Sequence, residues 1–162
     1  MTPHETSAEV NELVALYRRS HYDVVLPDAH RATLRIGEIA PPAIAEWIGA
    51  DAFALYLTAC NPYSMALTTA QNDERLVRLR ARLHAQGARW LEGHAGVPGE
   101  TWFEPSLLIA GLALAQGDRL AFEYEQNAGV WVDVVQPARL RVYRPDWRKL
   151  LAAAPDIDWI ER

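Results

Sequence analysis

One stretch of the chain, residues 53–64 (FALYLTACNPYS), constrains the fold more than any other. It begins as an uninterrupted apolar run and stops at Asn61-Pro62. Residues 52–59 are therefore expected to form a central strand that is apolar on both faces, either covered on both sides or lying in mid-sheet. Because proline cannot donate to a strand ladder, the pairing should end near Asn61. The strand would then deliver polar side chains to its end, where a site can form.

The remaining patterns place helices and strands on both sides of this central strand. A capping box at Thr68 and Gln71, followed by an apolar stripe, predicts the best-defined helix over 69–86. Gly117 should weaken the helix that contains it by about 1 kcal/mol relative to alanine. Helices are also expected over 7–19, 112–125 and 147–153, strands over 32–36, 88–92, 106–111, 129–135 and 138–143, and a loop over 93–100.

From residue 52 to residue 135 the expected order is strand–helix–strand–strand–helix–strand, as in the split βαβ, ferredoxin-like motif. We therefore expect an α+β protein: a two-layer sandwich with a ferredoxin-like core, an antiparallel or mixed sheet, an extra N-terminal helix and strand, and a C-terminal hairpin. The extra elements would extend the sheet or cover its other face. With 162 residues and neither a linker nor an internal repeat, the chain is expected to be one domain, 1–162, with its core over 22–143.

Composition narrows the classes of function. A hydrophobic content of 50% and a charged content of 23% are typical of a soluble globular protein. The formal net charge of −5 argues against a general nucleic-acid binder. No apolar run approaches the ~20 residues of a membrane span, and the N-terminus lacks the apolar segment of a secretory signal. No membrane partner and a cytoplasmic location are therefore expected, and the single cysteine, Cys60, excludes an intramolecular disulfide.

Three pieces of the sequence, taken together, resemble a known family. They are residues 57–64 (LTACNPYS) followed by Asn72, residues 104–106 (EPS) and residues 126–128 (QNA). Their order and spacing are similar to those of the bacterial DUF3293 family, small proteins of unassigned function, over roughly residues 22–135. Cys60 departs from the pattern, since a larger or aromatic residue is expected there. The resemblance implies a shared fold and no particular reaction.

These polar pieces border predicted strands, and strand ends can bring such positions together. We therefore expect a pocket for a small polar ligand, with Glu104 as the only strong candidate for a general base. The residues expected to line it are Thr58, Asn61, Ser64, Asn72, Glu104, Ser106 and Gln126. The alternative is structural: Asn61 could form a turn with its own backbone, Glu104 could pair with Arg75, and Gln126 could end a helix.

Two weaker candidate sites lie elsewhere in the sequence. Arg75, Arg78 and Arg82 share one face of the 69–86 helix and could bind an anion or an acidic partner, although a solvated helix surface explains them as well. The histidines lack the i, i+4 spacing of a helical metal site. His94 with Glu92 and Glu100 is the best of the metal sets, and a surface loop explains it better, so no metal and no cofactor are expected.

Three functions therefore compete. The first is a binding or regulatory module that uses the polar pocket. The second is a small cofactor-independent enzyme with Glu104 as general base, since Cys60 has no histidine near it in sequence to activate the thiol. The third is a protein-interaction module that uses the arginine-rich helix or Trp147 and Trp159, with a second copy of the chain or another protein as partner. The lack of a nucleophile–base pair, a metal set and a cofactor loop favours the first.

Overall fold

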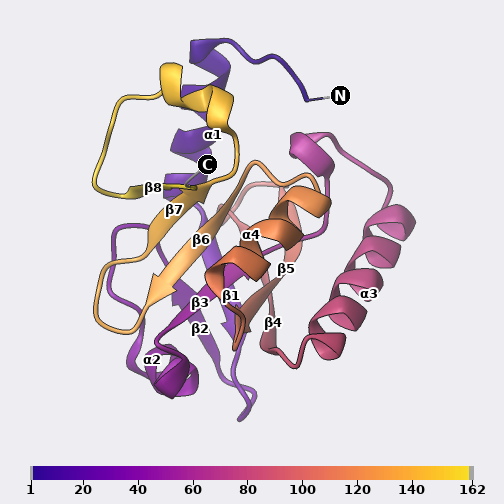
Figure 1. Cartoon of the computed structure of the whole chain (residues 1–162), viewed down its shortest axis with the longest axis vertical. Coiled ribbons are helices and arrows are strands. Elements are labelled where there is room, and N and C mark those ends of the chain that lie inside the picture. Colours follow the sequence, from indigo (N-terminus) through magenta and orange to yellow (C-terminus); the bar gives the residue numbers. More distant parts are fainter. Residues whose placement is uncertain (1, 161–162) are drawn as a thin grey trace.

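The computed structural model describes residues 2–160, which form four α-helices and one eight-stranded mixed sheet (Figure 1). The helices are α1 (Ser7–Arg19), α2 (Pro42–Ile48), α3 (Thr69–Ala85) and α4 (Leu114–Glu123). The strands are β1 (His21–Val25), β2 (Arg31–Leu34), β3 (Phe53–Leu57), β4 (Arg89–Gly96), β5 (Phe103–Ala110), β6 (Ala128–Asp133), β7 (Arg139–Val142) and β8 (Ile157–Trp159). Their order in the sheet is β2-β1-β4-β5-β3-β6-β7-β8, and only the β7–β8 pair is parallel within these residues. Within residues 2–160, no helix has both the length and the apolar character needed to cross a membrane.

The predicted two-layer, ferredoxin-like sandwich is wrong. The expected order of elements is present as β3–α3–β4–β5–α4–β6. However, β1 and β2 extend the sheet beyond β4, β7 and β8 extend it beyond β6, and the long sheet curls into a half-barrel (Figure 1). Helices α3 and α4 pack on one face, while α1 and α2 pack on the other.

The physical reason lies in β3, which is buried on both faces. Ala54 and Tyr56 belong to the apolar cluster that contains α2, whereas Leu55 and Leu57 belong to the cluster that contains α3 and α4. A strand that is apolar on both sides needs a packing layer on each side. The apolar run of the central strand therefore matches the observed arrangement and does not fit a sandwich of only two layers.

Two glycines allow neighbouring elements to approach closely. Strand β4 continues to Gly96, although a loop was expected from Gly93 onward. A Cβ at Gly93 would lie 1.9 Å from the backbone oxygen of Asp23 in β1, so the strands approach closely there because the side chain is missing. Gly117 has a similar role in α4, since a Cβ there would lie 2.3 Å from Leu55 Cδ1 in β3.

The C-terminal segment also differs from the prediction. The expected hairpin is present as the antiparallel pair β6 and β7. In place of the expected helix over 147–153, a 3₁₀ helix spans Pro145–Lys149, and β8 then pairs with β7. Helix α1 packs against these elements through Val10 and Val14. The N-terminal helix thus packs against the C-terminal segment.

Candidate functional site

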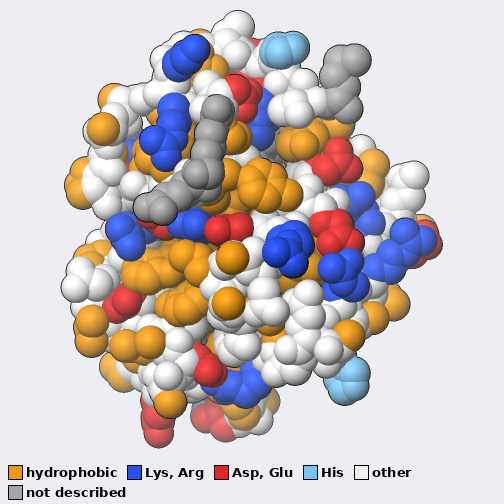
Figure 2. Space-filling view, viewed as in Figure 1, with side chains coloured by type: hydrophobic (Ala, Val, Ile, Leu, Met, Phe, Trp, Pro, Cys, Tyr) orange, Lys and Arg blue, Asp and Glu red, His pale blue; other side chains and the backbone are white. Residues whose placement is uncertain are grey.

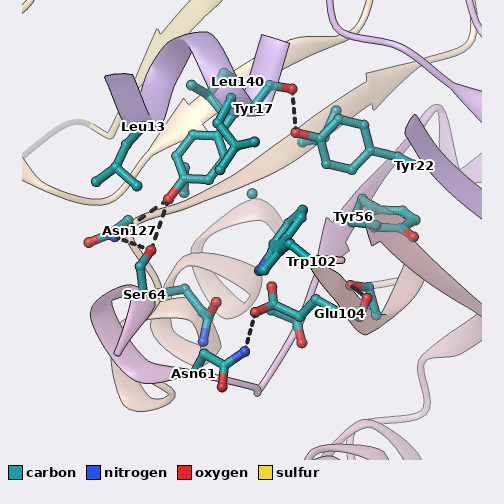
Figure 3. A pocket seen from close by; sticks show the side chains of 18 of the residues that line it. Leu13, Tyr17, Tyr22, Tyr56, Asn61, Ser64, Trp102, Glu104, Asn127 and Leu140 are labelled. Carbon is teal, nitrogen blue, oxygen red and sulfur yellow. Dashed lines mark hydrogen bonds between the residues drawn. The ribbon is translucent and has the colours of Figure 1, made fainter. Parts of the chain in front are cut away.

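A cavity of about 270 Å³ lies between α1 and the face of the sheet that α1 covers (Figure 3). Helix α1 contributes Leu13, Leu16 and Tyr17. The rest of the lining comes from the sheet, the loop after β3, Trp102 just before β5 and the turn before β6. These residues are Tyr22, Tyr56, Thr58, Asn61, Ser64, Ala66, Ala95, Trp102, Glu104, Ser106, Gln126, Asn127, Ala128, Gly129, Val130 and Leu140.

The register of the sheet explains why these side chains meet. Ala95 of β4 pairs with both Tyr22 of β1 and Glu104 of β5, and Tyr56 of β3 pairs with Val130 of β6. Residues that pair directly point to the same face of a sheet, so all five side chains face α1. The cavity is therefore a product of strand pairing between segments that are far apart in the sequence.

Among residues 2–160, Glu104 is the only residue with an acidic or basic side chain that lines the cavity. Its side chain is mostly buried, and its Oε2 accepts a hydrogen bond of 2.8 Å from Asn61 Nδ2. Burial raises the pKa of this carboxyl group from its ordinary 4.5 to about 7, although the hydrogen bond from Asn61 acts in the opposite direction. The suggested pairing with Arg75 is not present, because Arg75 donates instead to the backbone oxygens of Ala59 and Tyr124. A carboxyl group of this kind can take up or release a proton near neutral pH.

The loop that carries Asn61 has a strained backbone. Asn61, Tyr63 and Ser64 have φ angles of 47°, 48° and 62°, a region that asparagine tolerates and bulky residues rarely adopt. The Asn61 Oδ1 accepts hydrogen bonds from the Leu67 N–H at 3.0 Å and from Asn72 Nδ2 at 2.9 Å. The Asn61 N–H donates to Asn72 Oδ1 at 3.0 Å. These bonds hold the strained loop in place and direct the remaining amide donor of Asn61 toward Glu104.

The residues predicted to line a pocket, with the exception of Asn72, line this one cavity. Asn72 lies behind Asn61 and supports it. Three of the lining residues direct their donors to the backbone: Thr58 to the Pro105 oxygen at 2.6 Å, Ser106 to the Glu104 oxygen at 3.0 Å, and Gln126 to the Cys60 and Tyr124 oxygens at 3.0 Å each. These donors stabilise the walls, and a role of the set in binding a ligand stays a prediction.

The aromatic part of the cavity was missed by the sequence reasoning. Tyr17, Tyr22, Tyr56 and Trp102 all line it. The Tyr22 hydroxyl donates to the Tyr17 backbone oxygen at 2.7 Å, and the Tyr56 hydroxyl donates to the Asp23 backbone oxygen at 2.8 Å. Burial raises the pKa of all three tyrosines, so they are neutral at physiological pH. The only signal for Tyr56 is its place in the apolar run of the central strand, and that place indicates a core position.

An ion-pair cluster around the buried Arg144 holds the N-terminal segment beside the cavity. Asn127 donates to Ser64 Oγ at 3.1 Å and accepts a hydrogen bond of 2.9 Å from Arg144. Arg144 is 2% exposed and pairs with Glu5 and Asp146, each at 2.7 Å. Burial raises the pKa of both carboxyl groups, but the hydrogen bonds and charge of Arg144 outweigh it and hold each pKa below its usual range. The segment before α1 is thereby tied to the wall of the cavity.

The arginines of α3 are locally paired. Arg78 forms an ion pair of 2.5 Å with Glu74, and Arg82 forms one with Glu123 of α4. Figure 2 shows basic and acidic side chains next to each other over α3 and α4. Arg75 points inward to backbone oxygens, as described above. The three arginines therefore do not form a continuous positive face, and binding of an anion by them stays a prediction.

Cys60 and the histidines have structural surroundings. Cys60 is buried with its Sγ 3.7 Å from the Pro105 oxygen, and burial raises the pKa of its thiol, which opposes formation of the reactive thiolate. His94 Nε2 lies 3.2 Å from Asp23 Oδ2, and Glu92 pairs with an arginine of α3. Within residues 2–160, no group of three or more histidine, cysteine, aspartate or glutamate side chains is placed to hold a metal ion.

The C-terminal tryptophans are packed against the protein. Trp147 is 0% exposed, and Trp159 is partly buried against the same apolar cluster as α1. Arg148 lies over the Trp159 ring, 5.2 Å from its centroid. Because a docking residue must be accessible, Trp147 cannot serve as the predicted contact with another chain.

Comparison with known proteins gives one family. Neither the curated proteins nor the solved structures contain a match to the chain. The model of a family described as "protein of unknown function (DUF3293)" matches residues 57–128. This segment is shorter than the 22–135 suggested by the motifs, but it includes Asn61, Asn72, Glu104 and Gln126. The resemblance to the DUF3293 family of proteins of unknown function is thereby confirmed over residues 57–128.

Proposed function

We propose that the protein binds a small ligand in the cavity between α1 and the sheet. The observation that supports this most directly is Glu104, a mostly buried carboxyl group that lines the cavity and is held by Asn61 (Figure 3). A mostly apolar lining, a few polar groups and a perturbed titratable group are features that ligand sites share. The volume of about 270 Å³ is slightly below the ~300–1,000 Å³ of pockets for drug-sized molecules, so the ligand is small.

A fragment screen by NMR on the isotope-labelled full chain tests this proposal. Fragments that bind should shift the indole N–H signal of Trp102 and the side-chain amide signals of Asn61 and Asn127. Ala66 is exposed and lines the cavity, so Ala66→Trp should block its opening and abolish binding. Ala70 is exposed at the start of α3, so Ala70→Trp is the matched control and should bind the same fragments as the wild type. Fragment shifts that gather elsewhere, or binding that survives Ala66→Trp, would refute the proposal.

A second candidate is a small enzyme in which Glu104 is the general base. It is favoured by the pKa of about 7, which suits proton transfer at neutral pH. Glu104→Gln keeps the size of the side chain and an acceptor for Asn61, but it cannot take up a proton. If a ligand from the screen is turned over, this variant should still bind it and should lose turnover. Turnover that is unchanged in Glu104→Gln would exclude this role.

A further inference from the structure

We infer that the cavity recognises a small organic ammonium ion, whose charged group lies beside Glu104 and whose apolar body packs against Leu13, Leu16 and Leu140. This inference rests on the proposed function, because it names the class of ligand that the same cavity takes. Two features of the lining support it: the sign of its charge and the nature of its walls.

The charge at the cavity favours a cation. In the part of the chain that the structure describes, Glu104 of β5 is its only charged lining residue, and no lysine, arginine or histidine lines it. A ligand carboxylate or phosphate would therefore lose its hydration without gaining a counter-charge, whereas an ammonium group would gain one. Arg144 reaches the wall through Asn127, but its charge is already matched by two carboxylates.

The walls of the cavity also suit an ammonium ion. Tyr17 of α1, Tyr22 of β1, Tyr56 of β3 and Trp102 line the same space as Glu104 (Figure 3). The rings of Tyr22 and Tyr56 meet edge to face at 5.3 Å, and both hydroxyls donate to backbone oxygens. Their rings, rather than their hydroxyls, are therefore left to contact a ligand, and aromatic faces attract organic cations.

Binding of an ammonium ion should be coupled to the proton on Glu104. The tyrosines that share the cavity are neutral, so Glu104 is the titrating group there. When its carboxyl group is protonated, an ammonium ion that binds to the carboxylate displaces the proton to solvent. The ammonium ion keeps its own proton throughout. The affinity for an amine should therefore rise as the pH increases from 5.5 to 7.5, whereas the affinity for a neutral molecule of the same shape should not.

Three probes of nearly equal shape test this by titration calorimetry on the full chain: 2-phenylethylamine, 2-phenylethanol and phenylacetate. At pH 7.5 we expect the amine to bind at least about tenfold more tightly than the alcohol, because only the amine pairs with a carboxylate. We expect no binding of phenylacetate. Between pH 5.5 and 7.5 the affinity for the amine should rise roughly tenfold or more, since Glu104 ionises in this range.

Variants assign the effect to Glu104. Glu104→Gln should bind the amine and the alcohol equally, and Ala66→Trp should bind neither. Glu46→Gln, which changes an exposed glutamate of α2, should behave as the wild type. Three results would overturn the ammonium inference and leave small-ligand binding intact. These are equal binding of the amine and the alcohol by the wild type, tighter binding of phenylacetate than of the amine, and failure of the amine to bind when other fragments do. If no fragment of any charge binds in the cavity, the proposed function falls together with the inference.

Discussion

Glu104→Gln should raise the free energy of unfolding at alkaline pH, and this gain should be much smaller at acid pH. The wild type buries a carboxyl group whose pKa is about 7 in the folded chain, against 4.5 ordinarily. The folded state therefore binds this proton more tightly than the unfolded state does. As the pH rises from 4.5 to about 7, the free energy of unfolding should fall, because the charged form is held in a desolvated site. Glutamine has no charge to bury and should escape this loss.

The size of the effect follows from the two pKa values. At ~1.4 kcal/mol per pKa unit, the change from 4.5 to about 7 corresponds to about 3 kcal/mol, reached above pH 8. At pH 5 the unfolded carboxyl group is already partly ionised, so the same linkage gives a loss of about 1 kcal/mol. The advantage of Glu104→Gln over the wild type should therefore grow by about 2 kcal/mol between pH 5 and pH 8.5.

Urea denaturation followed by tryptophan fluorescence, repeated at half-unit steps of pH, measures this difference directly. Glu46→Gln is the control, because Glu46 is exposed on α2 and its replacement should give a difference that does not change with pH. A constant difference for Glu104→Gln across the same range would show that Glu104 does not titrate there in the folded chain. That result would remove the physical basis for both the general-base candidate and the proton coupling inferred for ligand binding.

Three further substitutions test the packing around the site, each by urea denaturation. Gly93→Ala should lower the free energy of unfolding by about 3 kcal/mol, because the new Cβ would clash with a backbone oxygen. Gly117→Ala should lower it by less, because its Cβ meets the end of a leucine side chain and alanine has the higher helix propensity. The reverse ranking would contradict the packing described. Asn61→Ala should lower the free energy of unfolding by about 3 kcal/mol, since it removes three side-chain hydrogen bonds and places alanine at a positive φ. Asn72→Ala should lower it by about half as much. Equal effects would mean that Asn61 has no role beyond its pairing with Asn72. Arg144→Met should lower the free energy of unfolding by about 2 kcal/mol at pH 7, mainly because the partly buried carboxylate of Glu5 loses its partner, whereas Asp146 is exposed. The pKa values of both carboxyl groups are lowered from 4.5 and 3.8, so their stabilisation is present above these values and is lost as the pH falls through the lower folded values. The effect of Arg144→Met should therefore shrink between about pH 4.5 and pH 3, and an effect that is the same at pH 7 and pH 3 would argue against this pairing.

The site shows how far residue types can indicate a pocket before its shape is known. Asn61, Glu104 and Gln126 were grouped because each borders a strand, and they do line one cavity. The contacts of each side chain could not be predicted in this way. Gln126 directs its amide to backbone oxygens, while Glu104 keeps a single side-chain donor, Asn61, among the described residues. This difference depends on the distances between three separate segments, and no local pattern encodes those distances.

The aromatic walls were missed for a related reason. Tyr17 ends an amphipathic helix, and Tyr56 alternates with leucines in a strand, so each one fits a core position when its own element is considered alone. They become cavity walls only because α1 packs over the sheet and leaves a cavity beside Glu104. Asn127 contacts Ser64, which is 63 positions away in the sequence, and Arg144, which is 17 positions away. Both separations are beyond the range of helix and strand periodicity.

The sequence by itself determined the local elements: the apolar strand that stops at Asn61-Pro62, the capped helix α3, and the order from β3 to β6, because apolar periodicity, capping residues and proline act over a few neighbouring positions. Only the tertiary structure decided the extension of the sheet to eight strands, its curling, and the closing of one face by α1. These features arise from pairing and packing between distant segments. The raised pKa of Glu104 arises in the same way, because the desolvation that causes it exists only once β5, the Asn61 loop and α1 come together.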